Sequence, residues 1–178
     1  LRAVSHPHVD VIGHPTGRRP GSREGANYDF EKVFKEAARH HVALEIDCDP
    51  ARMDLSPEMA RLALEAGCNF TLDADAHAPA EFAYVPMGMW MARRAGIPQD
   101  RIRLHVCWGN TEHPHVHDCP LAPLLPLLYR AKVGALSIEF ANPRHQHEYE
   151  ALRQNPLPAD MILIPGVIDT STNFVEHP

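Results

Sequence analysis

The chain has 178 residues, a formal net charge of −6 and a hydrophobic fraction of 44%, as expected of a globular protein with one core or two half-domains. It contains no apolar run of about 18 residues that would span a membrane, and its negative charge argues against a broad nucleic-acid-binding surface. Its four cysteines lack the density of a disulfide framework, which favours a reducing, cytoplasmic setting.

Short apolar runs recur along the chain in the form taken by strands that are buried on both faces. They begin about every 30 residues, which is the length of one βα unit. The predicted strands are Val9–Gly13, Val42–Asp47, Asn69–Asp73, Ile102–Cys107, Gly134–Glu139 and Met161–Pro165.

Helical patterns fill the intervals between these strands. In Tyr28–His40 the apolar residues fall on one face at helical spacing. Ser56 is typical of an N-cap for a helix over Pro57–Ala66, and Gly67 is typical of its C-terminal stop. Further helices are predicted over Ala80–Ala95, Leu121–Ala131 and His145–Arg153, the second of them with a kink at Pro126.

This alternation predicts an α/β fold with a parallel sheet and right-handed crossovers. We expect a partial TIM-barrel-like array of about six parallel strands, because a closed barrel needs about eight. A doubly wound open sheet is the alternative. No glycine-rich phosphate-binding motif of the kind found in such sheets follows any predicted strand.

Ionisable side chains stand at the C-terminal end of every predicted strand, where barrel enzymes gather their catalytic groups. Two sets form i, i+2 pairs, Asp75 with His77 and His105 with Cys107, and such pairs share a face of an extended segment. Imidazole, thiolate and carboxylate groups together favour a transition-metal site. The strand-end residues are His14, Glu45, Asp47, Asp73, Asp75, His77, His105, Cys107, Glu139 and Asp169.

Residues 1–95 contain the segments HVDVIGHPTGR (from His8), ALEI (from Ala43), DPARMDL (from Asp49) and DAH (from Asp75). These resemble the C-terminal half of a PHP domain, in the variety attached to bacterial family X DNA polymerases. The resemblance implies a distorted β/α barrel whose metal cluster hydrolyses phosphodiesters, commonly as a 3′–5′ exonuclease. Other ligands of that family, including an opening His-x-His, precede the segment that is matched here.

The PHP resemblance also implies roles for individual residues. His14, Asp75 and His77 would bind Zn²⁺ or Mn²⁺, Glu45 would support the reaction, and Arg18 would hold a phosphate. The substrate would be a phosphoester, and nucleic acid is a partner only under this hypothesis.

Residues 96–178 contain GIPQDRIRLHVCWGN (from Gly96), AKVGALSIE (from Ala131), ANPRH (from Ala141) and IPGVID (from Ile164). These resemble the C-terminal catalytic domain of cobalamin-independent methionine synthase, a zinc-dependent barrel. The resemblance implies Zn²⁺ ligands at His105, Cys107 and Glu139, with a further cysteine later in that family. Asp169 and the segment from Asn142 to His145 would contact the substrates, a small-molecule thiol and a methyl donor.

The loop from Glu112 to Cys119 is unusually rich in metal-ligand side chains. Cys119 is a candidate for the fourth zinc ligand, on proximity in sequence alone. A free thiol is the alternative.

Three hypotheses follow. The main one is zinc-dependent methyl transfer to a thiol, of the homocysteine-to-methionine type. The alternatives are a PHP-type metal-dependent phosphoesterase or 3′–5′ exonuclease, and a non-catalytic metal-binding fragment, so enzymatic activity is left open. Residues 1–95 and 96–178 are expected to form two half-barrels, packed as one domain or as two. A homo-oligomer could cover their exposed sheet edges.

Overall fold

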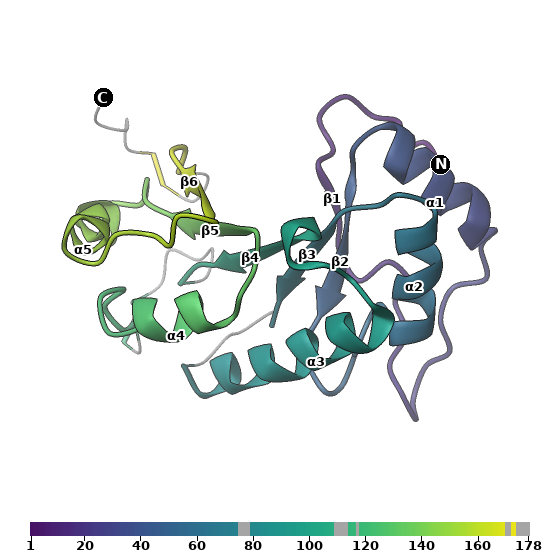
Figure 1. Ribbon diagram of the computed structural model, residues 1–178, viewed down its shortest axis with the longest axis horizontal. Helices are drawn as coiled ribbons and strands as arrows, with labels where there is room; N and C mark the ends of the chain where they lie inside the picture. The colour runs from purple at the N-terminus through teal and green to yellow at the C-terminus, as the bar shows by residue number, and fades with distance from the viewer. Residues whose placement is uncertain (75–78, 109–113, 117, 170–171, 174–178) are drawn as a thin grey trace.

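The computed structural model describes residues 1–74, 79–108, 114–116, 118–169 and 172–173, along which strands and helices alternate (Figure 1). Each of the six predicted strands is present, and the first is shorter than expected. The strands are β1 (Val11–Ile12), β2 (Ala43–Asp47), β3 (Phe70–Asp73), β4 (Ile102–Val106), β5 (Ala135–Glu139) and β6 (Ile162–Gly166).

The strands form one parallel sheet in the order β1-β2-β3-β4-β5-β6. Each βα unit therefore adds its strand beside the preceding one, and the order never reverses. A doubly wound sheet requires a reversal of this order, because that is how its helices come to cover both faces. The sheet is thus a section of a barrel-like array, and the predicted α/β fold class is confirmed.

The helices are α1 (Phe30–Arg39), α2 (Pro57–Glu65), α3 (Val85–Ala95), α4 (Leu125–Arg130) and α5 (Tyr149–Gln154). Helix α2 lies between α1 and α3, whereas α4 and α5 accompany the C-terminal strands (Figure 1). The predicted N-cap of α2 is confirmed, because the Ser56 hydroxyl accepts the main-chain N–H of Met59 at 3.3 Å. Asp29 caps α1 in the same manner.

Several predicted helices begin later than expected. The helix predicted over His145–Arg153 starts at Tyr149, after a 3₁₀ turn over Gln146–Glu148. The helix placed over Leu121–Ala131 starts at Leu125, so Pro126 lies in its first turn. A proline there loses no intrahelical hydrogen bond, and the predicted kink was wrong. The region from Ala80 to Ala95 begins with a 3₁₀ segment, Pro79–Tyr84, before α3.

The two faces of the sheet differ in chemistry. Paired residues of parallel strands share a face, and the row Ile46, Leu72, Leu104 and Leu136 is fully buried in the core. The opposite face carries Glu45 beside Thr71, Asp47 beside Asp73 and His105 beside Ser137. The fold therefore collects the ionisable residues on one face, toward the C-terminal ends of the strands.

Strands β3 and β4 join the two segments that were expected to be half-barrels. Phe70 pairs with Ile102, and Leu72 pairs with Leu104, in one register. In the part of the chain that is described, no helix is long and apolar enough to cross a membrane.

Candidate metal centre

The loop that follows β1 is held by a buried carboxylate. Asp54 has no exposed surface, and its carboxylate accepts the main-chain N–H groups of Thr16 at 3.0 Å and Gly17 at 2.8 Å. Arg18 donates from its guanidinium to the main-chain carbonyl of Met53, with its Nε at 3.1 Å. These contacts fix the loop against the segment that follows β2.

His14 and Glu45, two predicted site residues, are in contact at the start of this loop. The main-chain N–H of His14 donates to Glu45 Oε2, and the His14 residue itself is exposed. Its φ of 28° is in the left-handed region, which a non-glycine residue adopts at a cost. The Glu45 carboxylate therefore helps to hold His14 in a strained conformation at the sheet edge. Asp75 and His77 lie outside the described residues.

Asp47, also at the end of β2, is fully buried beside Arg52, whose Nε lies 3.3 Å from Asp47 Oδ2. Its other oxygen accepts the main-chain N–H of Asp49 at 2.9 Å. A buried carboxylate needs such compensation. These contacts give Asp47 a structural role in shaping the segment that follows β2.

His105 stands at the centre of the polar face. Its Nδ1 lies 3.3 Å from the hydroxyl oxygen of Ser137 on β5. Desolvation by the surrounding protein lowers the pKa of His105, and the nearby carboxylates of Asp73 and Glu139 oppose this shift. A neutral imidazole is the form that binds a metal ion. Cys107, just beyond β4, is half-buried.

Glu139 organises the loop that follows β5. Its Oε1 accepts the main-chain N–H groups of Ala141 at 2.5 Å and Asn142 at 2.8 Å. Gly166 on β6 lies so close that a Cβ there would be 2.9 Å from Glu139 Oε2. Asn142 is buried, and its side-chain oxygen accepts the main-chain N–H of Arg144 at 3.0 Å.

Asp169 and Cys119 were also singled out in the sequence. Asp169 follows β6 and accepts a hydrogen bond from the Thr172 hydroxyl at 2.5 Å. Burial raises the pKa of the Cys119 thiol, which disfavours the thiolate in the absence of a metal ion. The main-chain carbonyl of Cys119 accepts the indole N–H of Trp108 at 2.8 Å.

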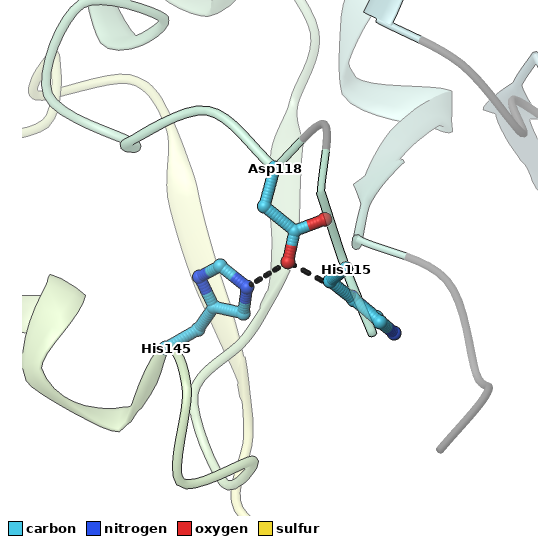
Figure 2. Close-up of side chains that lie close together, drawn as sticks. All are labelled: His115, Asp118 and His145. Carbon is cyan, nitrogen blue, oxygen red and sulfur yellow. Dashed lines mark hydrogen bonds and ion pairs between the residues drawn. The ribbon is translucent and has the colours of Figure 1, made fainter. Parts of the chain in front are cut away.

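A third group of ionisable side chains lies close together, and the sequence did not predict this. His115 Nδ1 and His145 Nε2 each lie 2.8 Å from Asp118 Oδ2, and Figure 2 shows the carboxylate between the two rings. The ligand-rich loop from Glu112 to Cys119 was the available signal for two of these residues. His145 comes from the loop after β5, and only the parallel pairing of β4 with β5 brings it near.

No protein-family model matches the chain. It is 40% identical over 75 residues to the DNA polymerase/3′-5′ exonuclease PolX of Bacillus subtilis, a match covering 42% of this chain and 13% of that protein. It is 33% identical over 87 residues to a probable phosphatase of Photobacterium profundum, covering 46% of this chain and 33% of that protein. A probable phosphatase of Vibrio campbellii is 25% identical over 112 residues, covering 59% of this chain and 42% of that protein.

The chain thus spans less than half the length of each of these three relatives. Their similarity supports a PHP-like relation. None of them supports the methionine-synthase-like part or the methyl-transfer hypothesis, and the phosphoesterase alternative is the better supported one.

Proposed function

We propose that the chain takes part in metal-dependent phosphoester hydrolysis of the PHP type. The observation that carries the proposal is the similarity to a protein named as a 3′-5′ exonuclease and to two named as probable phosphatases. The names differ in substrate, but both kinds of activity break a phosphoester bond. The polar sheet edge supplies imidazole and carboxylate groups suited to this chemistry.

In this proposal His14, Asp75 and His77 bind the metal ion, with Glu45 beside them. The contact between Glu45 and the main chain of His14 supports this assignment, because it brings the loop after β1 against a carboxylate of β2. A divalent ion bound there would polarise the phosphoester and lower the pKa of a water molecule. The loop carrying His14 is already fixed by Asp54, so placement of His14 needs little rearrangement.

Arg18 has a different part in this proposal from the one first expected. Its guanidinium already donates to the Met53 carbonyl, so it positions the loop through that contact. Its remaining N–H groups are the ones that would face a phosphate.

The test is hydrolysis of two chromogenic substrates by the chain in Mn²⁺. Bis-p-nitrophenyl phosphate is a phosphodiester of the kind an exonuclease cleaves, whereas p-nitrophenyl phosphate is a monoester. We expect release of p-nitrophenol that EDTA abolishes and that falls at least roughly tenfold in His77→Ala and His14→Ala, as for loss of a metal-site residue. His40→Ala, at an exposed histidine after α1, is the matched control and should retain the wild-type rate. Equal rates in wild type and His77→Ala, or no release above the metal-only blank, would overturn the proposal.

We propose separately that His105, Cys107 and Glu139 bind a zinc ion. Its support is that all three lie at the C-terminal ends of the neighbouring strands β4 and β5. Because Glu139 Oε1 accepts two main-chain N–H groups, its Oε2 is the oxygen available to a metal ion. Zinc titration of wild type and Cys107→Ser tests it, and an unchanged stoichiometry would remove Cys107 from the ligand set.

A further inference from the structure

The side chains of His115, Asp118 and His145 bring three potential ligand atoms together at the ends of β4 and β5 (Figure 2). The three atoms all lie within 4.8 Å of one another. The two histidine side chains are 6% and 8% exposed and the Asp118 side chain is 21% exposed. The two imidazoles of the cluster are therefore buried in the protein, and its carboxylate is partly accessible to solvent.

The ring of His145 is held in place by Trp108. Trp108 stacks on it, with ring centroids 3.9 Å apart and planes inclined by 7°. The Trp108 indole is itself fixed by its hydrogen bond to the Cys119 carbonyl. Such support of a ligand side chain is what a metal site requires of its surroundings.

The other ring nitrogen of His145 also faces a carboxylate. His145 Nδ1 is buried without a hydrogen-bond partner, and Glu148 Oε1 lies 3.5 Å from it. The second oxygen of Glu148 accepts the main-chain N–H of Leu121 at 2.9 Å, which fixes the carboxylate there. A neutral imidazole carries only one N–H, so His145 cannot donate toward both Asp118 and Glu148.

The contact of 2.8 Å between His145 Nε2 and Asp118 Oδ2 needs a proton on Nε2 or a metal ion bound to it. If the single proton of neutral His145 lies on Nδ1, where it faces Glu148, the Nε2 lone pair is free to bind a metal ion. A carboxylate beside the distal nitrogen of a histidine is the usual companion of a bound zinc ion.

We propose that His115 Nδ1, Asp118 Oδ2 and His145 Nε2 bind a zinc ion. Two imidazoles and one carboxylate suit zinc better than Ca²⁺ or Mg²⁺, which prefer oxygen ligands. Ligand atoms about 2.0 Å from a tetrahedral zinc ion lie roughly 3.3 Å apart. Asp118 would therefore retreat by about 0.5 Å, and the two imidazole nitrogens, which lie within 4.8 Å of each other, would adjust to the same separation. The fourth position faces solvent on the Asp118 side and is open to water or to a substrate group.

This site is independent of the proposed phosphoesterase centre, because its ligands come from the loops after β4 and β5. A bound ion would tie these two loops together. If the chain hydrolyses no phosphoester, this zinc site can still be present. If the zinc site is absent, phosphoester hydrolysis at the other centre can still take place.

The experiment is a zinc competition titration of chelator-treated protein against a chromophoric zinc indicator. We expect Asp118→Ala and His145→Ala each to bind one zinc ion fewer per chain than wild type. His147→Ala removes an exposed histidine two residues from His145 and is the matched control, with wild-type stoichiometry expected. Cys107→Ser, measured in parallel, separates this ion from one bound at His105, Cys107 and Glu139.

Glu148→Gln keeps the experiment decisive if His145→Ala does not fold. The amide oxygen of glutamine can still accept the Leu121 N–H, but the negative charge beside His145 Nδ1 is lost. We expect zinc affinity at this site to fall about 10- to 100-fold, as for other partners of metal-bound histidines. Imidazole ¹⁵N spectra should show zinc-dependent shifts of His115 and His145.

Two results would overturn the proposal. One is an unchanged zinc stoichiometry in Asp118→Ala. The other is a spectrum in which His145 is protonated on both nitrogens and does not respond to zinc.

Discussion

The pKa of His105 is lowered by desolvation on the polar face of the sheet. The unfolded chain therefore binds more protons than the folded chain in the pH range between the lowered pKa and the ordinary histidine value of about 6.5. Stability rises with pH through this range and is lost on acidification.

His105→Gln is expected to remove this part of the pH dependence. In metal-free protein, the free energy of unfolding of wild type should fall more steeply on acidification from neutral pH than that of the variant, as urea denaturation at several pH values would show. His147→Ala, at an exposed histidine, should follow the wild-type curve. If the free energy of unfolding of the variant fell as steeply with acidification as that of wild type, His105 would not titrate as described.

Asp54 is a second residue whose contribution can be isolated. Asp54→Ala leaves the N–H groups of Thr16, which is buried, and Gly17, which is half-buried, without their acceptor, so we expect a loss of about 2–3 kcal/mol in the free energy of unfolding. Asp10→Ala, at an exposed aspartate, should change stability by less than about 0.5 kcal/mol. Under the proposed function, Asp54→Ala should also weaken metal binding through His14. Equal stability of the two variants would contradict the role given to Asp54.

At the scale of helices and strands, the sequence predicted the sheet well because each strand coincides with a short, largely apolar run. The helix starts were harder to predict. Leu121 to Leu124 carry the apolar pattern of a helix and form a hydrogen-bonded turn, but α4 itself begins only at Leu125. Glu148, at the end of a 3₁₀ turn, was missed because its role depends on contacts with Leu121 and His145.

Gly88 allows α3 to pack closely against the sheet. Helix propensity alone favours alanine there by about 1 kcal/mol. However, a Cβ at Gly88 would lie 2.1 Å from Cys48 Sγ and 3.2 Å from Leu72 Cδ1. Because overpacking a core costs about 1–3 kcal/mol, Gly88→Ala should destabilise the protein despite its better propensity.

A double-mutant cycle gives the measurement. Cys48→Ala removes the sulfur that the new methyl group would meet, so its destabilisation and that of Gly88→Ala should not add, with a coupling of at least about 0.5 kcal/mol. Cys68→Ala removes another fully buried thiol that is not in contact with Gly88, and the same cycle with it should be additive. A stabilised Gly88→Ala variant would show that α3 does not approach the sheet this closely.

For the molecule as a whole, the parallel sheet was predictable from the regular spacing of βα units. The strand order was not, because a doubly wound sheet has the same spacing, and neither was the convergence of separate loops. His115, Asp118 and His145 are distributed over two loops, and no local pattern relates Asp118 to a histidine 27 residues away. By contrast, the contact between His14 and Glu45 lies at a strand end, where the pattern of ionisable residues had placed both.

The continuous sheet also bears on whether residues 1–95 and 96–178 fold together. Strands β3 and β4 pair across the expected junction, and one hydrophobic core includes buried residues from both segments, such as Leu72 and Leu104. Unfolding one segment would expose the paired strand and core surface of the other. We therefore expect a single cooperative transition.

The two tryptophans allow this to be measured, because Trp90 lies in α3 and Trp108 lies just after β4. Trp108→Phe leaves only Trp90 to report on the first segment, and Trp90→Phe leaves only Trp108 to report on the second. In each variant the fluorescence and far-ultraviolet circular dichroism curves in urea should coincide, with a common slope, as a two-state transition requires. Trp108→Phe should have the lower midpoint, because it loses the hydrogen bond to the Cys119 carbonyl and weakens the stacking on His145. If Trp108 fluorescence changed at lower urea than the circular dichroism of the same variant, the second segment would unfold on its own, and the pairing of β3 with β4 would not couple the two halves.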